Sequence, residues 1–442
     1  MRHRLTRWGA FGVAVALLAG CSTTSKPTAT PQAISSTPPR YSYTIVDPLA
    51  ATVVGTPAPL RADVPDDIDI SELDLTVFED REFPSIFWYA NTLRYSLVYQ
   101  DHTAPLIFLV AGTGAGHDSA KMKFLQKAFF QGGFHVISLP SPTYLDFIVS
   151  GSTTSVPGRA EDDARDLYRA MQLAYEEVKD RIEVSKFHLS GYSLGAWNAA
   201  FIAKQDETEQ AFDFEKVLLI NPPVSLYNSV DILDNMLTDN VPGGINNLHV
   251  FFEDFINQIA DIYVESDTVN FTAEELLFRL YTETEPGDEE LAALIGLAFR
   301  LSSTSMLFTS DVMNNFGYIV PKNLQLGTSS SLTPFFQAGT RVSFVQYFNQ
   351  VYVPYFQSQQ PSLTRQDMID QASLQSIEDY LVGASKIGLS TNEDDIILAP
   401  GEIEYLAQIF GPKRAKIFPT GGHMGNLEER AVTAHIVGFF KS

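Results

Sequence analysis

The sequence predicts an α/β fold in which a doubly wound, mostly parallel β-sheet is interrupted by a helical insertion. The first observation is the run PLIFLVAG at residues 105–112, which is continuously apolar and closed by glycine, as a strand covered on both faces requires. The second is that such runs alternate with helical patterns, which is typical of parallel strands joined by crossover helices. The third is that residues 226–381 lack a strong strand pattern and break the alternation.

Further apolar runs predict the other strands of the sheet. Buried strands are expected at residues 105–112, 134–140, 186–193, 216–223, 385–391 and 415–422. Two earlier runs, at residues 73–78 and 85–97, mix aromatic with β-branched residues as edge strands do. Amphipathic helices are expected at residues 159–181 and 400–410.

The insertion carries several amphipathic helix patterns. We expect helices at residues 246–265, 288–301, 341–356 and 365–382, and a further one that starts at Thr272 with a capping box to Glu275. Aromatic residues cluster within two of these patterns, namely Phe251, Phe252 and Phe255, and Tyr347, Phe348, Tyr352 and Phe356. At helical spacing such clusters are more often a packed core than the lining of an apolar groove, so a core is the favoured interpretation.

Composition excludes several classes of protein. The chain has 442 residues, a formal net charge of -23 and a pI near 4.6, which excludes a basic nucleic-acid binder. With 45% hydrophobic and only 19% charged residues the chain can bury a large core. A single cysteine excludes an internal disulfide framework and a multi-cysteine metal site. No cluster of Cys or His predicts a metal, and none is expected.

The first residues have the features of an export signal. Arg2, Arg4 and Arg7 precede an apolar run at residues 8–18, which is too short to cross a bilayer as a permanent helix. The run ends in Leu-Ala-Gly-Cys at residues 18–21, which resembles the cleavage motif of bacterial lipoproteins. The resemblance implies that residues 1–20 are removed and that Cys21, the only cysteine, becomes a lipid-modified N-terminus on a membrane.

The resemblance also bears on localisation. Ser22 follows the cysteine, and in Gram-negative bacteria a residue other than Asp there usually directs a lipoprotein to the outer membrane. The sequence has no basic patch, so attachment to the bacterial cell envelope would depend on the acyl chains. Residues 21–65 are rich in Ser, Thr, Pro and Ala, and we interpret them as an extended tether.

The strongest chemical motif is Gly-Tyr-Ser-Leu-Gly at residues 191–195. It follows an apolar strand directly and precedes a helix-forming run, which is the context of a nucleophile elbow. Such a turn forces Ser193 into a strained conformation, and the flanking glycines let the backbones approach. The hydroxyl is then exposed at the edge of the sheet, and the Leu194 N–H points toward developing negative charge.

With this context the sequence resembles the α/β-hydrolase superfamily. Strand, elbow and helix match at residues 187–204, and the resemblance extends in pieces over residues 105–223 and 385–442. It implies a hydrolase core in two parts, at residues 66–225 and 382–442, with residues 226–381 as a helical cap. The family uses the order Ser, acid, His and places the histidine after the last strand.

The resemblance selects candidates for the two remaining side chains. His423 lies in the glycine-rich loop after the last strand, and it is the expected base; a purely structural histidine is the alternative. The acid should follow the penultimate strand. Asp395 is favoured because apolar residues come directly after it, Asp394 remains an alternative, and Glu393 is a more distant one.

A second oxyanion donor is expected from the glycine turn at residues 112–116. Free backbone N–H groups are what such a turn supplies, and the donor is Thr113 or Gly114. A phosphate-binding loop is the rival interpretation. It is disfavoured because the third glycine of the dinucleotide fingerprint and the Lys-Ser/Thr of a P-loop are missing.

These candidates predict a lipid-anchored serine hydrolase that cleaves carboxylic esters through an acyl-enzyme, with no cofactor. The substrate would be a small-molecule or lipid acyl ester, although the same three side chains serve thioesterases and peptidases. A different class of function is also compatible with the sequence. An envelope lipoprotein could keep the hydrolase scaffold only to bind a lipid or a partner.

Overall fold

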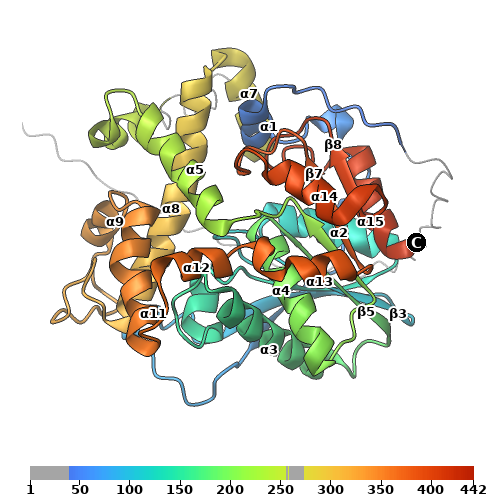
Figure 1. Ribbon diagram of the computed structural model, residues 1–442, viewed down its shortest axis with the longest axis horizontal. Coiled ribbons are helices and arrows are strands. Elements are labelled where there is room, and N and C mark those ends of the chain that lie inside the picture. The colour runs from blue at the N-terminus through green and yellow to red at the C-terminus, as the bar shows by residue number, and fades with distance from the viewer. Residues whose placement is uncertain (1–38, 255–256, 258–272) are drawn as a thin grey trace, which may run out of the picture. The chain divides into compact units, whose positions relative to one another are not determined.

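The computed structural model describes residues 39–254, 257 and 273–442 (Figure 1). The expected signal peptide, the lipidation site Cys21, Ser22 and the first part of the tether lie outside the described residues. So do Phe255 and the capping residue Thr272.

An eight-stranded sheet forms the centre of the fold, with the strand order β1-β2-β4-β3-β5-β6-β7-β8. Pairing is antiparallel between β1 and β2 and between β2 and β4, and parallel from β4 to β8. This topology confirms the predicted α/β-hydrolase fold. The strands are β1 (Ser71–Leu75), β2 (Leu93–Val98), β3 (Ala104–Val110), β4 (His135–Leu139), β5 (Val184–Tyr192), β6 (Lys216–Ile220), β7 (Ile387–Asn392) and β8 (Ala415–Phe418).

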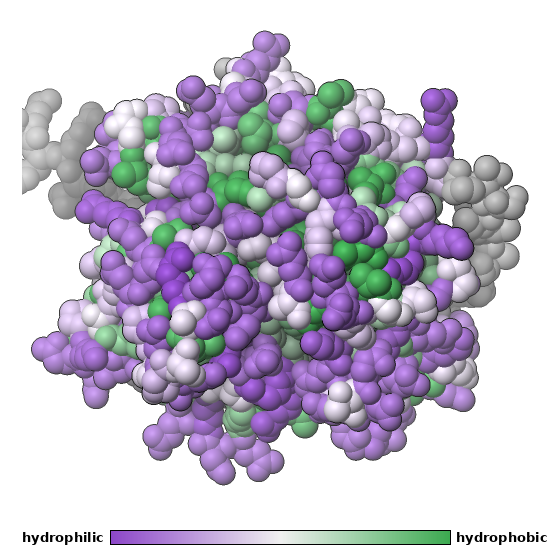
Figure 2. Space-filling model, viewed as in Figure 1, coloured by the Kyte–Doolittle hydropathy of each residue, from purple (hydrophilic) through white to green (hydrophobic). Residues whose placement is uncertain are grey.

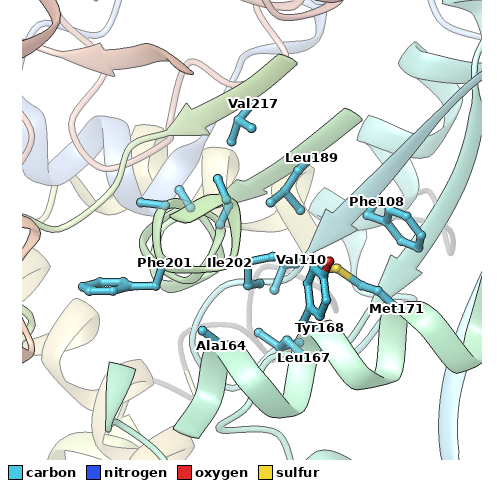
Figure 3. Close-up of a cluster of buried hydrophobic side chains, with 14 of the residues drawn as sticks. Phe108, Val110, Ala164, Leu167, Tyr168, Met171, Leu189, Phe201, Ile202 and Val217 are labelled. Atoms are coloured by element: carbon cyan, nitrogen blue, oxygen red, sulfur yellow. The ribbon is translucent and has the colours of Figure 1, made fainter. Parts of the chain in front are cut away.

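Helices bury both faces of this sheet, which explains the continuous apolar runs. On one face α3 (Ala160–Val178) and α4 (Leu194–Glu209) pack on alternate strand residues such as Phe108 and Val110 (Figure 3), and α14 (Glu402–Arg414) belongs to the same core. On the other face α2 (Ala120–Gly132) and α15 (Arg430–Lys441) pack on Ile107 and Leu109. Successive residues of β3 therefore point into two different cores.

The strand expected at residues 85–97 is shorter than predicted. Ser85–Phe87 form a 3₁₀ turn (η2) after Pro84, and the strand begins only at Leu93. Phe87 is buried because its ring packs against Phe308 of the insertion, with centroids 6.2 Å apart. The apolar pattern there came from packing on a distant helix, which local sequence cannot distinguish from a strand.

The tether prediction is wrong for residues 39–65. Pro48–Val54 form helix α1, and Ala58–Leu60 form a 3₁₀ turn (η1). Asp47 caps α1 by accepting a hydrogen bond from the Ala50 N–H, and Pro48 occupies its first position. Ala50 and Ala51 are completely buried, so this segment belongs to the fold and not to a spacer.

The described residues between 226 and 383 form helices joined by loops, with no β-strand among them. Two patterns were misread. Helix α5 (Leu226–Asn240) lies in a stretch for which no helix was expected, and α8 (Asp288–Asn314) continues well beyond residue 301. The other elements are η4 (Ile245–Asn247), α7 (Ala273–Thr284), α9 (Thr333–Gly339), α10 (Phe344–Tyr347), η5 (Phe348–Tyr352), α11 (Val353–Gln359), α12 (Arg365–Gln371), η6 (Leu374–Ile377) and α13 (Glu378–Gly383).

Aromatic side chains of the insertion form its core, as the favoured interpretation predicted. Tyr347, Phe348, Tyr352 and Phe356 are all buried; the ring of Tyr352 stacks on Phe348 and meets Phe356 edge to face. Phe251 is buried, whereas Phe252 is partly exposed. On the face of the molecule shown in Figure 2 hydrophilic residues predominate, and apolar residues occur in separate patches.

One helix of the described residues, α8, is long and apolar enough to cross a membrane, but 72% of its apolar window is buried inside the protein. It carries Arg300, whose guanidinium is buried and paired with the buried carboxylate of Asp234 on α5. Arg300 Nη1 also donates to the Thr340 carbonyl at 3.0 Å, and Asp234 accepts from the Phe344 N–H at 3.0 Å. This ion pair therefore connects α5, α8 and the start of α10.

We expect Arg300→Leu to lower the free energy of unfolding by about 3–5 kcal/mol, because Asp234 would remain buried without its partner. The double variant Arg300→Leu/Asp234→Leu should recover part of that loss, since no uncompensated charge is left. Urea denaturation followed by circular dichroism measures both values. A double variant that is less stable than Arg300→Leu would contradict this account.

Acid should destabilise the fold through His188 on β5 and His435 on α15. Burial lowers the pKa of each to about 4, so the native state holds fewer protons than the unfolded chain between pH 4 and pH 6.5. Stability is therefore lost as the pH falls through that window, by about 3 kcal/mol per histidine at most. His188→Phe should make the free energy of unfolding less dependent on pH in this window, because phenylalanine does not titrate. Phenylalanine should also fit the site, since the histidine ring already packs against Phe134 and Phe440. An unchanged slope would show that His188 is not responsible.

Candidate active site

Ser193 occupies a sharp turn between β5 and α4. Its backbone has φ 53° and ψ -125°, a conformation that L-residues rarely adopt. Glycines make the turn possible: a Cβ on Gly191 would clash with the Gly195 carbonyl, and one on Gly195 would clash with the Val110 carbonyl of β3. The turn is held from the other side by the Ser193 N–H, which donates to the Ile220 carbonyl of β6 at 2.8 Å.

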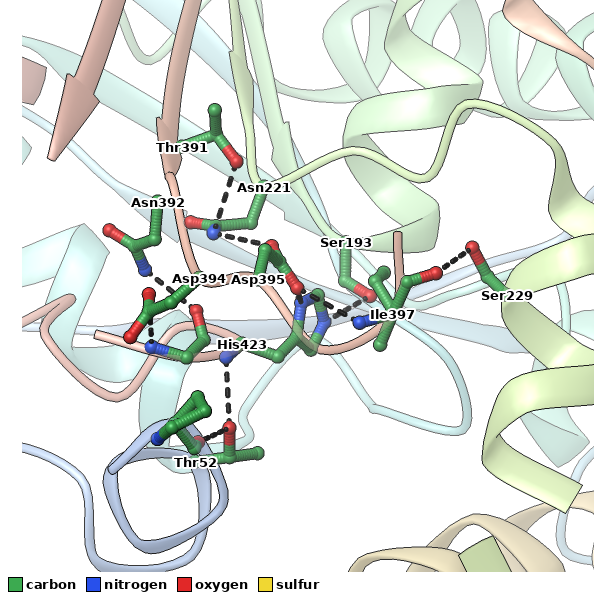
Figure 4. Close-up of polar contacts among 12 residues, drawn as sticks. Thr52, Ser193, Asn221, Ser229, Thr391, Asn392, Asp394, Asp395, Ile397 and His423 are labelled. Carbon is green, nitrogen blue, oxygen red and sulfur yellow. Dashed lines mark hydrogen bonds and ion pairs between the residues drawn. The ribbon is translucent and has the colours of Figure 1, made fainter. Parts of the chain in front are cut away.

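His423 lies beside this serine although the two are far apart in sequence. It belongs to the loop between β8 and α15, and its Nε2 is 3.0 Å from the Ser193 Oγ (Figure 4). The imidazole is largely buried, with 16% of the side chain exposed. A hydroxyl and an imidazole at this distance can exchange a proton.

Asp395 contacts the other nitrogen of the same ring. Its Oδ1 is 2.9 Å from His423 Nδ1, and the carboxylate has no exposed surface. Two further donors orient it: the Asn221 Nδ2 at 2.8 Å and the Ile397 N–H at 3.3 Å. Because Nδ1 faces a carboxylate, the neutral ring would carry its proton there and leave Nε2 as the acceptor for the serine proton.

The competing carboxylates have other positions. Asp394 accepts hydrogen bonds from the N–H groups of Gly421 and Gly422, at 3.1 and 2.9 Å, and so anchors the turn before His423. Burial raises the pKa of Asp394, although these two N–H groups act in the opposite direction. Glu393 is exposed to solvent. The structure brings only Asp395 of the three to the imidazole.

The two candidates for the second oxyanion donor, Thr113 and Gly114, lie in the glycine turn after β3 and have different hydrogen bonds. The Gly114 N–H donates to the Thr143 hydroxyl at 2.8 Å, so it is already engaged and does not suit the role of oxyanion donor. Within the described residues we find no acceptor for the N–H of Thr113 or of Leu194. Leu194 directly follows the serine at the start of α4, and Thr113 lies in the turn after β3, so these two N–H groups stay the candidates for oxyanion donors.

A helix of the insertion, α8, contacts this glycine turn. A Cβ on Gly114, which has φ +67°, would lie 2.8 Å from the Ser302 Cβ of α8. Only glycine combines that conformation with so close a helix. Helix α8 of the insertion therefore lies directly against the glycine turn that follows β3.

Some residues of the site carry no local signal in the sequence. Asn221 is the first residue after β6 and has φ 48°; a polar residue at the carboxyl end of a strand beside β7 was the only clue. Thr52 and Thr143 offered none, because both act through contacts between distant segments. Among the described residues no group of three or more His, Cys, Asp or Glu side chains could hold a metal ion.

Comparison with known proteins yields structural matches only. No family model and no curated protein matches the chain. A Pyrococcus furiosus esterase aligns over 91% of this chain and 98% of its own at 10% identity, with a TM-score of 0.40. A thermostable carboxyl esterase from Bacillus coagulans (85% and 99%, 12% identity, TM-score 0.39) and a lipase in its open form (84% and 98%, 14% identity, TM-score 0.40) are similar to the same extent. Similarity at this level says nothing about the substrate.

We expect Gly195→Ala to destabilise the protein strongly, because the new methyl group would overlap a backbone carbonyl that cannot move aside. Gly438→Ala is the matched control: this helical glycine in α15 has open space around it, so the change should stabilise the protein by about 0.5–1 kcal/mol. Thermal unfolding compares the two. Equal melting temperatures for Gly195→Ala and wild type would disprove the close approach.

Proposed function

We propose that the protein is a serine hydrolase that cleaves carboxylic esters through an acyl-enzyme. The observation that carries this proposal is the unbroken chain of hydrogen bonds from Asp395 through His423 to Ser193. A strained serine at the edge of a parallel sheet, with an imidazole on its Oγ, is costly to maintain for stability alone. Nucleophilic catalysis gives a reason for both features.

In the proposed reaction the Ser193 Oγ attacks the carbonyl carbon while His423 Nε2 takes the hydroxyl proton. The oxygen of the tetrahedral intermediate is stabilised by the N–H groups of Leu194 and Thr113. When the intermediate collapses, the bond to the leaving alcohol breaks and His423 returns the proton to that alcohol. Asp395 stabilises the imidazolium in between, and water then releases the acid by the same steps.

The proposed substrate class is an acyl ester, either a small molecule or a lipid. The same arrangement of side chains would also serve a thioester or a peptide bond, so acyl-chain length and leaving group have to be found by screening. No step requires a metal or an organic cofactor.

The proposed setting is the outer membrane of the bacterial cell envelope, with attachment through a lipidated Cys21. Since the described fold begins at residue 39, the tether proposed between Cys21 and the enzyme is reduced to residues 22–38. Mass spectrometry of the N-terminal peptide from membrane fractions would test the anchor independently of activity.

A fluorophosphonate probe should label the wild type and not Ser193→Ala, and p-nitrophenyl ester turnover should fall by several orders of magnitude in that variant. Ser385→Ala, which changes an exposed serine at the start of the segment leading into β7, should behave like wild type. A folded wild-type protein that is neither labelled nor active would disprove the proposal. Full rescue of a deletion phenotype by Ser193→Ala would favour the non-catalytic binding role.

Asparagine variants should distinguish the roles of the neighbouring residues Asp395 and Asp394. Asp395→Asn should lower kcat by about 10³–10⁴-fold, because the imidazole loses its orienting charge and tautomer. Asp394→Asn should cost less than about tenfold, because Asp394 supports the loop and does not contact the ring. Steady-state kinetics on one p-nitrophenyl ester gives both ratios, and a larger loss for Asp394→Asn would reverse the assignment.

A further inference from the structure

The loop that carries His423 is packed directly against helix α1, from the other end of the chain. A Cβ on Gly422 would lie 2.5 Å from the Thr52 Oγ1 and would clash with the Pro48 carbonyl. One on Gly425 would clash with the Ala51 carbonyl. The glycines on either side of His423 are therefore required by α1, which touches the loop backbone to backbone.

Thr52 forms a specific hydrogen bond within this contact. Its hydroxyl donates to the Pro48 carbonyl at 2.7 Å and accepts from the His423 N–H at 2.9 Å (Figure 4). The first bond uses the only hydroxyl proton, so the oxygen presents a lone pair to the histidine backbone. The backbone of His423 is thus fixed by a side chain from α1.

Other residues of the N-terminal segment hold the loop on both sides of His423. The Thr56 hydroxyl donates to the Gly425 carbonyl at 2.8 Å. The Tyr41 hydroxyl donates to the Thr420 carbonyl at 2.6 Å and accepts from the Asn426 Nδ2 at 3.0 Å. Residues 41–56 therefore contact the loop before, at and after the histidine.

The loop has a backbone that needs such support. Gly421, Gly422 and Met424 have φ values of 139°, 53° and 66°, so the backbone has positive φ on both sides of His423, and Met424 is strained because it has a side chain. Strained conformations persist only where surrounding contacts determine them. Asp394 holds one side through the Gly421 and Gly422 N–H groups, and α1 holds the other.

We propose that Thr52 of helix α1 is a positioning residue that sets the location of the His423 imidazole relative to Ser193, and that the Tyr41 and Thr56 hydroxyls support the same loop. The catalytic consequence rests on the proposed function. Thr52 touches neither the substrate nor the reacting atoms; it acts through the backbone of the base. A displacement of the base by about 1 Å is enough to lower a rate about 10²-fold.

The test compares Thr52→Val with Thr52→Ser in the full-length protein. Thr52→Val removes the acceptor for the His423 N–H, and we expect kcat to fall by about 10- to 100-fold with KM unchanged. Thr52→Ser keeps the hydroxyl and should restore most of kcat. Thr44→Val, the same chemical change at an exposed position of the segment, should behave like wild type.

A second background distinguishes positioning from general stability. In His423→Ala the base is absent, so adding Thr52→Val should not lower the residual rate further. An additional loss of the same size there would overturn the proposal, as would wild-type kcat in the single variant Thr52→Val. If Thr52→Val fails to fold, Tyr41→Phe removes a single hydroxyl from the same contact and should lower kcat in the same direction with KM unchanged.

Amide hydrogen exchange tests the contact without relying on activity. Exchange in the peptide that contains His423 should become about tenfold faster in Thr52→Val, while peptides of β3 and β5 should be unaffected. Unchanged exchange would overturn the inference even in an active enzyme. If wild type were inactive while exchange responded as expected, the proposed function would fail and the positional contact would stand.

Discussion

The geometry of the site depends on one constraint, the close backbone approach around Ser193. The turn from β5 into α4 can form only if α4 lies against β3 and its own first residues lie against the end of β5, and glycine at positions 191 and 195 permits both. The strain at Ser193 is then held by the sheet on either side of β5. Every other group of the site is arranged around a hydroxyl whose direction this turn fixes.

Asp395 and His423 follow two neighbouring strands, β7 and β8, and the adjacent residues Asp394 and Asp395 make different contacts there. Asp395 contacts the imidazole, whereas Asp394 binds the backbone before His423. The order of β7 and β8 in the sheet brings these residues together, because parallel strands end at the same edge. Helix α1 contacts the His423 loop on its other side, through the Thr52 hydroxyl.

The insertion has its own core and its own polar connection. Stacked aromatic rings along η5 and α11 bury its apolar surface, and the pair of Arg300 and Asp234 joins its helices. Such a pair contributes little net stability but strongly penalises any packing that separates its charges. It therefore helps to fix α8, the helix that lies against the glycine turn after β3 at Gly114.

Much of this protein could be predicted from the sequence, for identifiable reasons. The buried strands were found because a strand covered on both faces must be apolar throughout, and the elbow because a turn of that kind admits only glycine beside the serine. Ser193, His423 and Asp395 were selected by a family resemblance together with strand order, and their meeting is a property of the fold alone.

Tertiary structure decided what depends on contacts between distant segments. It engaged the Gly114 N–H in a hydrogen bond to Thr143, and it placed Asp395 on the imidazole and Asp394 on the backbone before it. It also showed that residues 39–65, which were expected to be a spacer, belong to the fold. Ala50 and Ala51 are buried there, and the Ala51 carbonyl lies against Gly425, far along the chain. Composition and periodicity describe only local preferences, and these outcomes depend on which remote backbone a residue meets.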